Sequence, residues 1–147
     1  YAGMQPLARP LSVLLNRAIA VDERFDAVTA VPLHWRKHWR RGFNQAELLA
    51  RQIARRRGVP LIRALRRKRP TEVQASLAVA GRHRNVAGAF EARARADVRG
   101  KRILLIDDVM TTGATASACA TVLKRAGAKS VSLATLARVD RRWSAKL

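Results

Sequence analysis

The sequence has one cysteine, few aromatic residues and no long apolar run. Cys119 stands alone among 147 residues, so neither a disulfide nor a multi-cysteine zinc site can form within the chain. We expect Cys119 to be a small buried apolar residue on a helix. Aromatic residues make up 5% of the chain, so the core must be built from Ala, Val, Leu and Ile. No segment approaches the roughly 18–20 apolar residues that cross a bilayer, and no signal peptide is visible. We therefore expect a cytoplasmic protein.

Acidic residues are also scarce. The chain has 10 of them against 30 basic residues, which gives a formal net charge of +20. Such an excess attracts polyanions, either phosphorylated metabolites or nucleic acid. Biased codon usage would also produce a protein rich in Ala and Arg. Aromatic residues beside a basic run are limited to Trp35, Trp39 and Phe43, fewer than a dedicated single-strand binder normally offers.

The apolar pattern predicts helices that alternate with short strands. The predicted helices cover 7–20 (Leu7, Leu11, Leu14, Leu15, Ala18 and Ile19 inward), 44–57 (capped by Asn44, ended by Gly58) and 114–126 (ended by Gly127). The predicted strands are 28–31, 59–65, a short one from Phe90, 102–106 and 131–137. Residues 66–84 are charged and predict a long loop, and residues 138–147 an exposed tail. This alternation indicates an α/β fold with a mainly parallel sheet, a domain spanning 1–138 and a tail at 139–147.

Ligands of such sheets bind beyond the carboxyl ends of the strands. That rule points to the segments after Val31, after Ile106 and after Ala137. Neither a G-x-x-x-x-G-K-[ST] nor a G-x-G-x-x-G motif occurs, so the two commonest nucleotide loops are excluded.

The segment after Ile106 combines an acidic pair with a small-residue loop. Asp107 and Asp108 are adjacent, and two like charges are costly to bury unless hydroxyl donors, a metal or arginines meet them. Thr111, Thr112, Gly113, Ala114 and Thr115 follow, directly before a predicted helix. Small residues there let backbone N–H groups converge on an anion, and the threonine hydroxyls add donors. A sugar phosphate matches both halves of this arrangement.

Residues 103–115 closely resemble the signature of type I phosphoribosyltransferases, which bind phosphoribosyl pyrophosphate (PRPP). The resemblance implies the type I phosphoribosyltransferase fold. It implies that Asp107 and Asp108 contact the ribose 2′- and 3′-hydroxyls, and that residues 111–115 hold the 5′-phosphate. A divalent metal, usually Mg²⁺, would accompany the pyrophosphate, with Asp107 and Asp108 as the side chains near it.

Two further segments resemble the ComF family. They are Val31-Pro32-Leu33 followed by Arg41-Gly42-Phe43-Asn44-Gln45, and Thr71-x-x-Gln74-x-x-Leu77 followed by Arg82-x-x-Asn85-Val86-x-Gly88-x-Phe90. The resemblance implies that Arg36, Lys37 and Arg41 lie in a pyrophosphate loop, where arginine's fork suits phosphate oxygens. A solvated basic loop is the alternative.

Residues 66–84 would then be the loop that closes over PRPP and excludes water. Arg82 is the candidate that reaches a phosphate and, with Asp107 and Asp108, completes the expected catalytic set. Gln74 and Asn85 could equally brace the loop. His34, His38 and His83 lack metal-ligand spacing and are interpreted as surface or loop residues.

The sequence also departs from the ComF pattern. The four-cysteine zinc module that commonly precedes the domain is absent, and we expect truncation before Tyr1. Ser is common in the family at the position of Ala78, and Glu at the position of Gly81.

Two functions stay open at this level. The chain could transfer phosphoribosyl to a nitrogen base, or bind PRPP and single-stranded DNA in natural competence without catalysis. An RNA-binding regulatory role is a third option that no residue selects. No hood over the acceptor base is recognisable, so the base is undefined. Related proteins are commonly dimers, which leaves a homodimer open.

Overall fold

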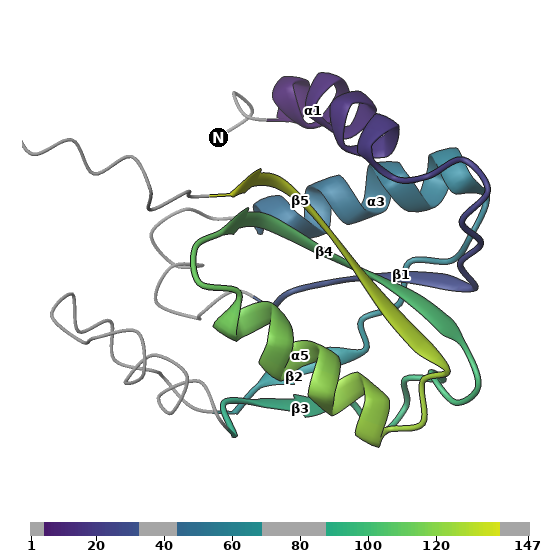
Figure 1. Cartoon of the computed structure of the whole chain (residues 1–147), viewed down its shortest axis with the longest axis vertical. Helices are drawn as coiled ribbons and strands as arrows, with labels where there is room; N and C mark the ends of the chain where they lie inside the picture. Colours follow the sequence, from purple (N-terminus) through teal and green to yellow (C-terminus); the bar gives the residue numbers. More distant parts are fainter. Residues whose placement is uncertain (1–4, 33–43, 69–87, 139–147) are drawn as a thin grey trace, which may run out of the picture.

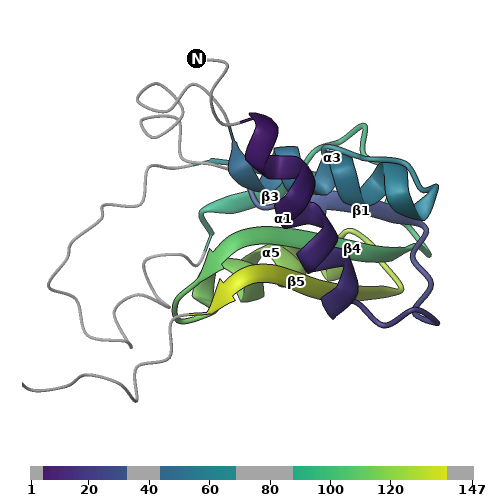
Figure 2. The same ribbon diagram turned by 90° about the horizontal axis from the view of Figure 1, so that it is seen from above.

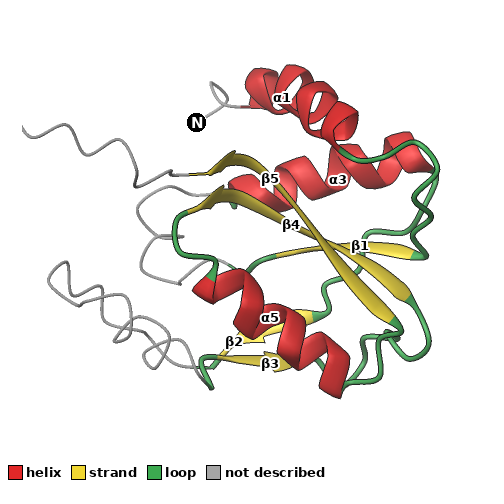
Figure 3. Ribbon diagram, viewed as in Figure 1, coloured by secondary structure: helices red, strands yellow, loops and turns green. Residues whose placement is uncertain are grey.

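The computed structural model describes residues 5–32, 44–68 and 88–138, which form a three-layer α/β arrangement (Figures 1 and 3). A parallel sheet has the order β1-β4-β5, and β2 and β3 form a separate antiparallel pair. The predicted α/β class with a mainly parallel sheet is confirmed. The helices are α1 (Gln5–Ala18), α3 (Gln45–Arg57) and α5 (Ala114–Arg125), and the strands are β1 (Ala27–Ala30), β2 (Leu65–Arg67), β3 (Phe90–Ala92), β4 (Arg102–Met110) and β5 (Ser130–Arg138).

The central strand β4 joins two core clusters. Side chains alternate across a strand, so Ile103 and Leu105 face one side of the sheet while Leu104 and Ile106 face the other. Helices α1 and α3 cover the face of Leu104 and Ile106, and α5 with the β2–β3 pair covers the opposite face (Figure 1). All four of these β4 side chains are at most 1% exposed, which explains why the sequence shows a continuous apolar run.

Helix α3 begins and ends as the sequence predicts. The side chain of Asn44 accepts a hydrogen bond from the Ala46 N–H at 3.1 Å, which caps the first turn. Gly58 ends the helix in the left-handed conformation, with φ of 64°, and its N–H bonds the carbonyls of Ala54 and Arg55. These two caps fix the length of the helix, and Asn44 also ties its start to the end of β1 through the Val31 carbonyl.

Helix α1 is confirmed, but its predicted buried face is partly wrong. Leu15 and Ile19 are buried, whereas Leu7 is 52% and Leu14 58% exposed, and Leu11 and Ala18 also face solvent. The inward stripe is Ala8, Ser12, Leu15 and Ile19. This stripe has helical spacing as well, and its small residues allow α1 to lie close to α3 and β5.

The strands differ from prediction in three places. The predicted strand 59–65 does not form, and within it Leu61 makes only one isolated bridge to Val28. The strand β2 begins instead at Leu65 and continues to Arg67, into the segment 66–84 that was predicted to be a loop. Strand β4 continues to Met110 because β5 keeps pairing with it, from Arg102 opposite Ser130 to Met110 opposite Arg138. Arg138 therefore belongs to β5 and not to the tail. The remaining strand predictions are confirmed within one residue at β1, β3 and β5.

In the described ranges, no helix has the length and apolar character that crossing a membrane requires.

Candidate functional site

The carboxyl ends of the three parallel strands meet at one edge of the sheet, as predicted. The Val31 N–H donates to the Ile106 carbonyl at 2.9 Å, and Val109 pairs with Ala137. The ends of β4 and β5 lie side by side in both Figure 1 and Figure 2, next to the turn that leads into α5. Strands β1, β4 and β5 therefore end at the same edge, where the sequence predicts the ligand site.

Asp107 is the one buried acidic residue among those described, at 8% exposure. Its Oδ1 accepts the Asp108 N–H at 3.0 Å, and the Oδ1 of Asp108 accepts the Val109 N–H at 2.9 Å. Burial, and next the charge of Asp108, raise the pKa of Asp107 to about 7. None of the ion pairs found in the described ranges includes either carboxylate. Holding these two carboxylates together therefore lowers the stability of the fold, and a hydroxyl group or a cation from a bound ligand would reduce that cost.

The two carboxylates interact with each other but border different parts of the fold. Asp107 follows Ile103 and Leu105 in the alternation and faces the side of α5, where its charge acts on the Cys119 thiol. Asp108 borders a groove of about 250 Å³ on the side of α1 and α3. That groove is mostly apolar, with Leu7, Leu11, Leu48, Leu49, Val109 and Leu136 among its lining.

The loop after β4 leads into the N-terminus of α5. Gly113 occupies the N-cap with φ of 76° and supplies no side-chain cap, and the Ser117 N–H makes the first helical bond to the Gly113 carbonyl at 2.8 Å. The Ala114 N–H contacts the Thr112 hydroxyl at 3.4 Å. The N–H groups of Thr115 and Ala116 precede the helical ladder and lack a carbonyl partner within it. This end of α5 can therefore receive an anion.

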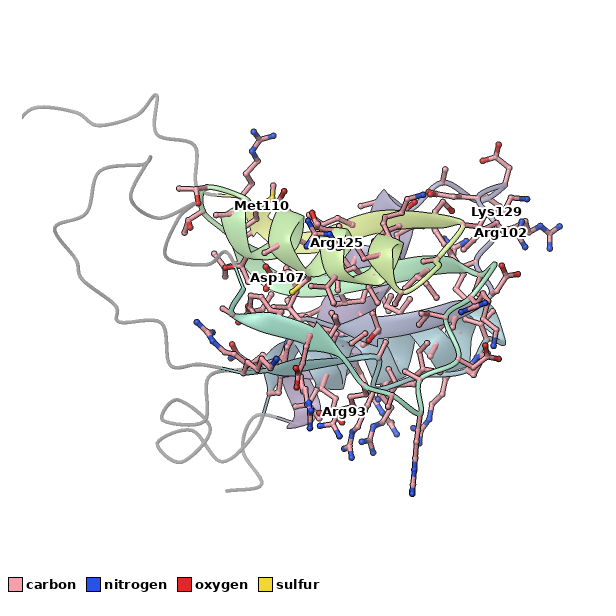
Figure 4. The ribbon with its side chains drawn as sticks, turned by 90° about the horizontal axis from the view of Figure 1, so that it is seen from below. Arg93, Arg102, Asp107, Met110, Arg125 and Lys129 are labelled. Atoms are coloured by element: carbon pink, nitrogen blue, oxygen red, sulfur yellow. The ribbon has the colours of Figure 1, made fainter. Side chains whose placement is uncertain are left out.

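Figure 4 shows Asp107 and Met110 at the same end of the molecule, near the start of α5. Five of the seven residues predicted to bind PRPP, Thr111 to Thr115, lie on the loop after β4 and in the first turn of α5, two residues beyond the aspartates. The loop residues range from the exposed Thr111 to the buried Ala114, with Thr112, Gly113 and Thr115 partly buried.

Arg67 is a basic residue near the site that the sequence analysis did not single out. It lies on β2, with its guanidinium 5.2 Å from the centre of the Phe90 ring. Burial lowers its pKa, and its charge, like that of Asp107, acts on Cys119. The run Arg66-Arg67-Lys68-Arg69 was visible in the sequence, but which of the four turns inward depends on the β2–β3 pairing.

Cys119 is buried on α5, as predicted. Burial raises the pKa of its thiol to about 12, so it stays protonated and unreactive.

The structure also shows what holds the ends of the two predicted loops. The Nδ2 of Asn44 donates to the Val31 carbonyl at 3.1 Å, so one side chain ties the end of β1 to the start of α3. The Lys68 N–H donates to the Ala89 carbonyl at 2.8 Å, which closes the base of the β2–β3 pair. Arg36, Lys37, Arg41 and Arg82 lie outside the described residues, as do Gln74, Asn85, the three histidines and the Trp35, Trp39 and Phe43 group.

No group of three or more His, Cys, Asp or Glu side chains that could hold a metal ion occurs within residues 5–32, 44–68 and 88–138. Asp107 and Asp108 supply two adjacent carboxylates. Mg²⁺ prefers oxygen ligands and usually keeps several waters beside one or two carboxylates and substrate phosphates. The described carboxylates therefore fit a Mg²⁺ that arrives with a phosphorylated ligand.

Residues 39–147 match the phosphoribosyl transferase domain family, and the chain belongs to that family. Its fold is the type I phosphoribosyltransferase fold. Glutamine PRPP amidotransferase from B. subtilis is 26% identical, with a TM-score of 0.60 over 88% of this chain and 26% of the amidotransferase chain.

The curated relatives confirm the ComF resemblance. DNA utilization protein YhgH of Escherichia coli (strain K12) is 40% identical over 129 residues, which cover 87% of this chain and 56% of the relative. Competence protein F of Haemophilus influenzae (strain Rd) is 35% identical over 115 residues, which cover 77% of this chain and 50% of the relative. The chain thus spans about half the length of the curated relatives it matches.

Proposed function

We propose that this domain binds PRPP together with Mg²⁺ at the carboxyl edge of the sheet. The observation that supports this is one short stretch, 107–115, where the buried Asp107 and the partly buried Asp108 precede a helix N-terminus whose N-cap, Gly113, has no side chain to cap it. Asp107 and Asp108 would accept the ribose 2′- and 3′-hydroxyls, and the loop from Thr111 to Thr115 would hold the 5′-phosphate. The positive end of the α5 dipole favours that phosphate.

The pyrophosphate would lie toward the segments that follow Pro32 and Lys68. Arg36, Lys37 and Arg41 are proposed for the first segment and Arg82 for the second. When bound, Mg²⁺ would neutralise the charge of the pyrophosphate, with Asp107 and Asp108 as the side chains of this chain that can reach it.

Binding is tested with the double substitution Asp107→Asn with Asp108→Asn. Asparagine keeps the size of aspartate but removes the charge and replaces one acceptor oxygen by an NH₂ donor. PRPP affinity should therefore fall below detection in calorimetry with Mg²⁺, while the circular dichroism spectrum stays unchanged. Unchanged PRPP affinity in the folded double variant would contradict the assignment.

A more specific proposal is that the chain transfers the phosphoribosyl group of PRPP to a nitrogen base. Loss of pyrophosphate from C1′ would give a transition state with oxocarbenium character, which positioning and charge stabilisation favour. The apolar groove beside Asp108 offers a place for a flat acceptor ring, because it adjoins the aspartate that is proposed to hold the ribose. The test is PRPP-dependent pyrophosphate release with a panel of bases and Mg²⁺. No release with any base, despite PRPP binding, would favour a binding protein over an enzyme.

DNA binding is the second candidate function. Its support is the +20 charge and the names of two relatives, which refer to DNA utilization and competence. A filter-binding titration with single-stranded DNA at low salt tests it, and binding should weaken steeply as salt rises. A homodimer and a cytoplasmic location remain proposals of the same kind, tested by sedimentation and by cell fractionation.

A further inference from the structure

The amino edge of the sheet, opposite the PRPP site, carries a cluster of basic side chains. It is formed where the segment after β3, the start of β4 and the turn between α5 and β5 meet. We define this amino-edge cluster as Arg93, Arg95, Arg99, Lys101, Lys124, Arg125 and Lys129. The segment 92–99 and Ala126 line an open hollow of about 420 Å³ within it. Asp97 is the one acidic residue on that lining.

Three members of the cluster have a structural role. Lys101 pairs with Asp97 at 2.7 Å and so neutralises it. The Nε of Arg93 donates to the Leu65 carbonyl at 3.4 Å, and the Nζ of Lys124 donates to the Lys129 carbonyl at 2.8 Å. Cations near a helix C-terminus are also stabilised by the dipole, which accounts further for Lys124.

Among the other four members, Arg125 also lies in the last turn of α5, where the dipole favours a cation, and the charge of Lys129 acts on Asp26, whereas Arg95 and Arg99 have no such role. Arg95, Arg99, Arg125 and Lys129 are exposed, and among the described residues none of them is in an ion pair. Like charges gathered at one edge repel each other, and no ion pair among the described residues offsets that repulsion at these four side chains. An external polyanion would remove the repulsion.

Backbone hydrogen bonds hold the cluster in one arrangement. The Gly100 N–H donates to the Gly127 carbonyl at 2.8 Å, and the Lys129 N–H donates to the Lys101 carbonyl at 2.9 Å. A Cβ at Gly127 would come within 3.3 Å of the Arg99 Cγ, so the glycine lets the two segments lie this close. The charges are thus set on a fixed frame, which lowers the cost of ordering them on binding.

The cluster is remote from the PRPP site. Helix α5 begins at the phosphate loop and ends at Arg125, twelve residues and about 18 Å later. Figure 4 shows Lys129 at the opposite end of the molecule from Asp107, with Arg125 between them. A single PRPP molecule therefore does not explain this charge.

We propose that the amino-edge cluster binds the phosphate backbone of a DNA strand. The inference rests on the second candidate function and assigns its location. Arginine matches phosphate oxygens with two donors, and several exposed cations along an edge suit a chain of phosphates rather than one buried anion. The described aromatic residues, Phe25 and Phe90, are buried, so neither offers a ring for base stacking at the cluster. We therefore expect the cluster to bind phosphates independently of the bases.

The test compares two triple variants with equal loss of charge. Arg95→Gln/Arg99→Gln/Arg125→Gln removes the cluster, and Arg17→Gln/Arg55→Gln/Arg56→Gln removes three exposed arginines from α1 and α3. Each is titrated against a fluorescent 20-nucleotide dT strand and an abasic strand of the same length. The cluster variant should bind at least tenfold more weakly than the unmodified chain, and its log–log salt slope should fall by about 2. The control should stay within about threefold.

Three results would overturn the proposal. They are equal losses in the two variants, a failure of the abasic strand to bind, or displacement of the strand by saturating PRPP with Mg²⁺. Absence of any strand binding by the unmodified chain would reject DNA binding altogether, whereas binding that survives in the cluster variant rejects only this location. Calorimetry with PRPP reports the other site independently, and it should give the same affinity in all three proteins.

Discussion

Asp107 shows at the scale of one residue how a proposed binding site opposes stability. In the folded chain its pKa is raised to about 7, against an ordinary value of 3.8. Between these two values the folded state binds more protons than the unfolded state, so stability falls as pH rises through that window. The protein tolerates this cost where a ligand can repay it, a trade-off expected of functional residues.

Asp107→Asn should therefore stabilise the chain above pH 7 and lose that advantage near pH 4. The expected gain in the free energy of unfolding at pH 8 is roughly 1–3 kcal/mol, because part of the pKa shift is relieved by local rearrangement. Urea unfolding at both pH values measures it. Asp22→Asn is the matched control, since Asp22 is exposed, and it should show no such difference. A variant less stable than the unmodified chain at pH 8 would contradict the account.

Alanine substitutions at Gly113 and Gly58 distinguish the effect of backbone strain on stability from an effect on ligand binding. Both have left-handed φ values, 76° and 64°, and an added Cβ meets nothing closer than the Met110 Sδ at 3.6 Å at Gly113 and nothing within 4 Å at Gly58. Alanine at either position should cost about 1–2 kcal/mol of stability from the conformation alone. Only Gly113→Ala should also weaken PRPP binding, by about tenfold, because it alters the start of α5. Calorimetry and urea unfolding of both variants check this, and equal PRPP affinities would contradict it.

At the scale of elements, the helix caps could be predicted from the sequence, but the pairing of the strands could not. Asn44 and Gly58 mark α3 in the sequence because capping is decided by residues close in the chain. The extent of β4 was underestimated because its continuation to Met110 depends on β5, which lies about thirty residues further on. The β2–β3 pair was missed for the same reason: Leu65 opposes Ala92 across a long intervening segment.

The site followed the same division. Residues 107–115 could be proposed as a site from the sequence because they all lie on one strand–loop–helix unit. Arg67 could not, because its approach to Phe90 and Cys119 requires β2 to pair with β3 first. The buried face of α1 could not be predicted from the sequence either, because two apolar stripes of this helix have helical spacing. Packing against α3 and β5 buries the stripe of Leu15 and Ile19 and leaves Leu7 and Leu14 exposed.

At the scale of the whole molecule, the excess charge should make stability depend on salt. A formal charge of +20 on 147 residues repels itself in the compact state. Raising NaCl from about 20 mM to about 300 mM shortens the screening length from roughly 20 Å to roughly 6 Å. Salt also weakens attractive pairs, but those found here, such as Lys101 with Asp97, are largely exposed and contribute only about 0–1 kcal/mol each. Relief of repulsion should therefore exceed the loss of ion pairs.

The expected result is a rise of several degrees in Tm over that range of salt, measured by differential scanning calorimetry. Stronger apolar association in salt could also raise Tm, and the Arg17→Gln/Arg55→Gln/Arg56→Gln variant distinguishes the two causes. It leaves the buried apolar residues in place but carries three fewer positive charges, so its Tm should begin higher at low salt and rise less. A Tm that falls with salt, or an equal rise in both proteins, would show that self-repulsion does not limit this fold. In that case the unpaired arginines of the amino edge would carry no cost for a polyanion to remove.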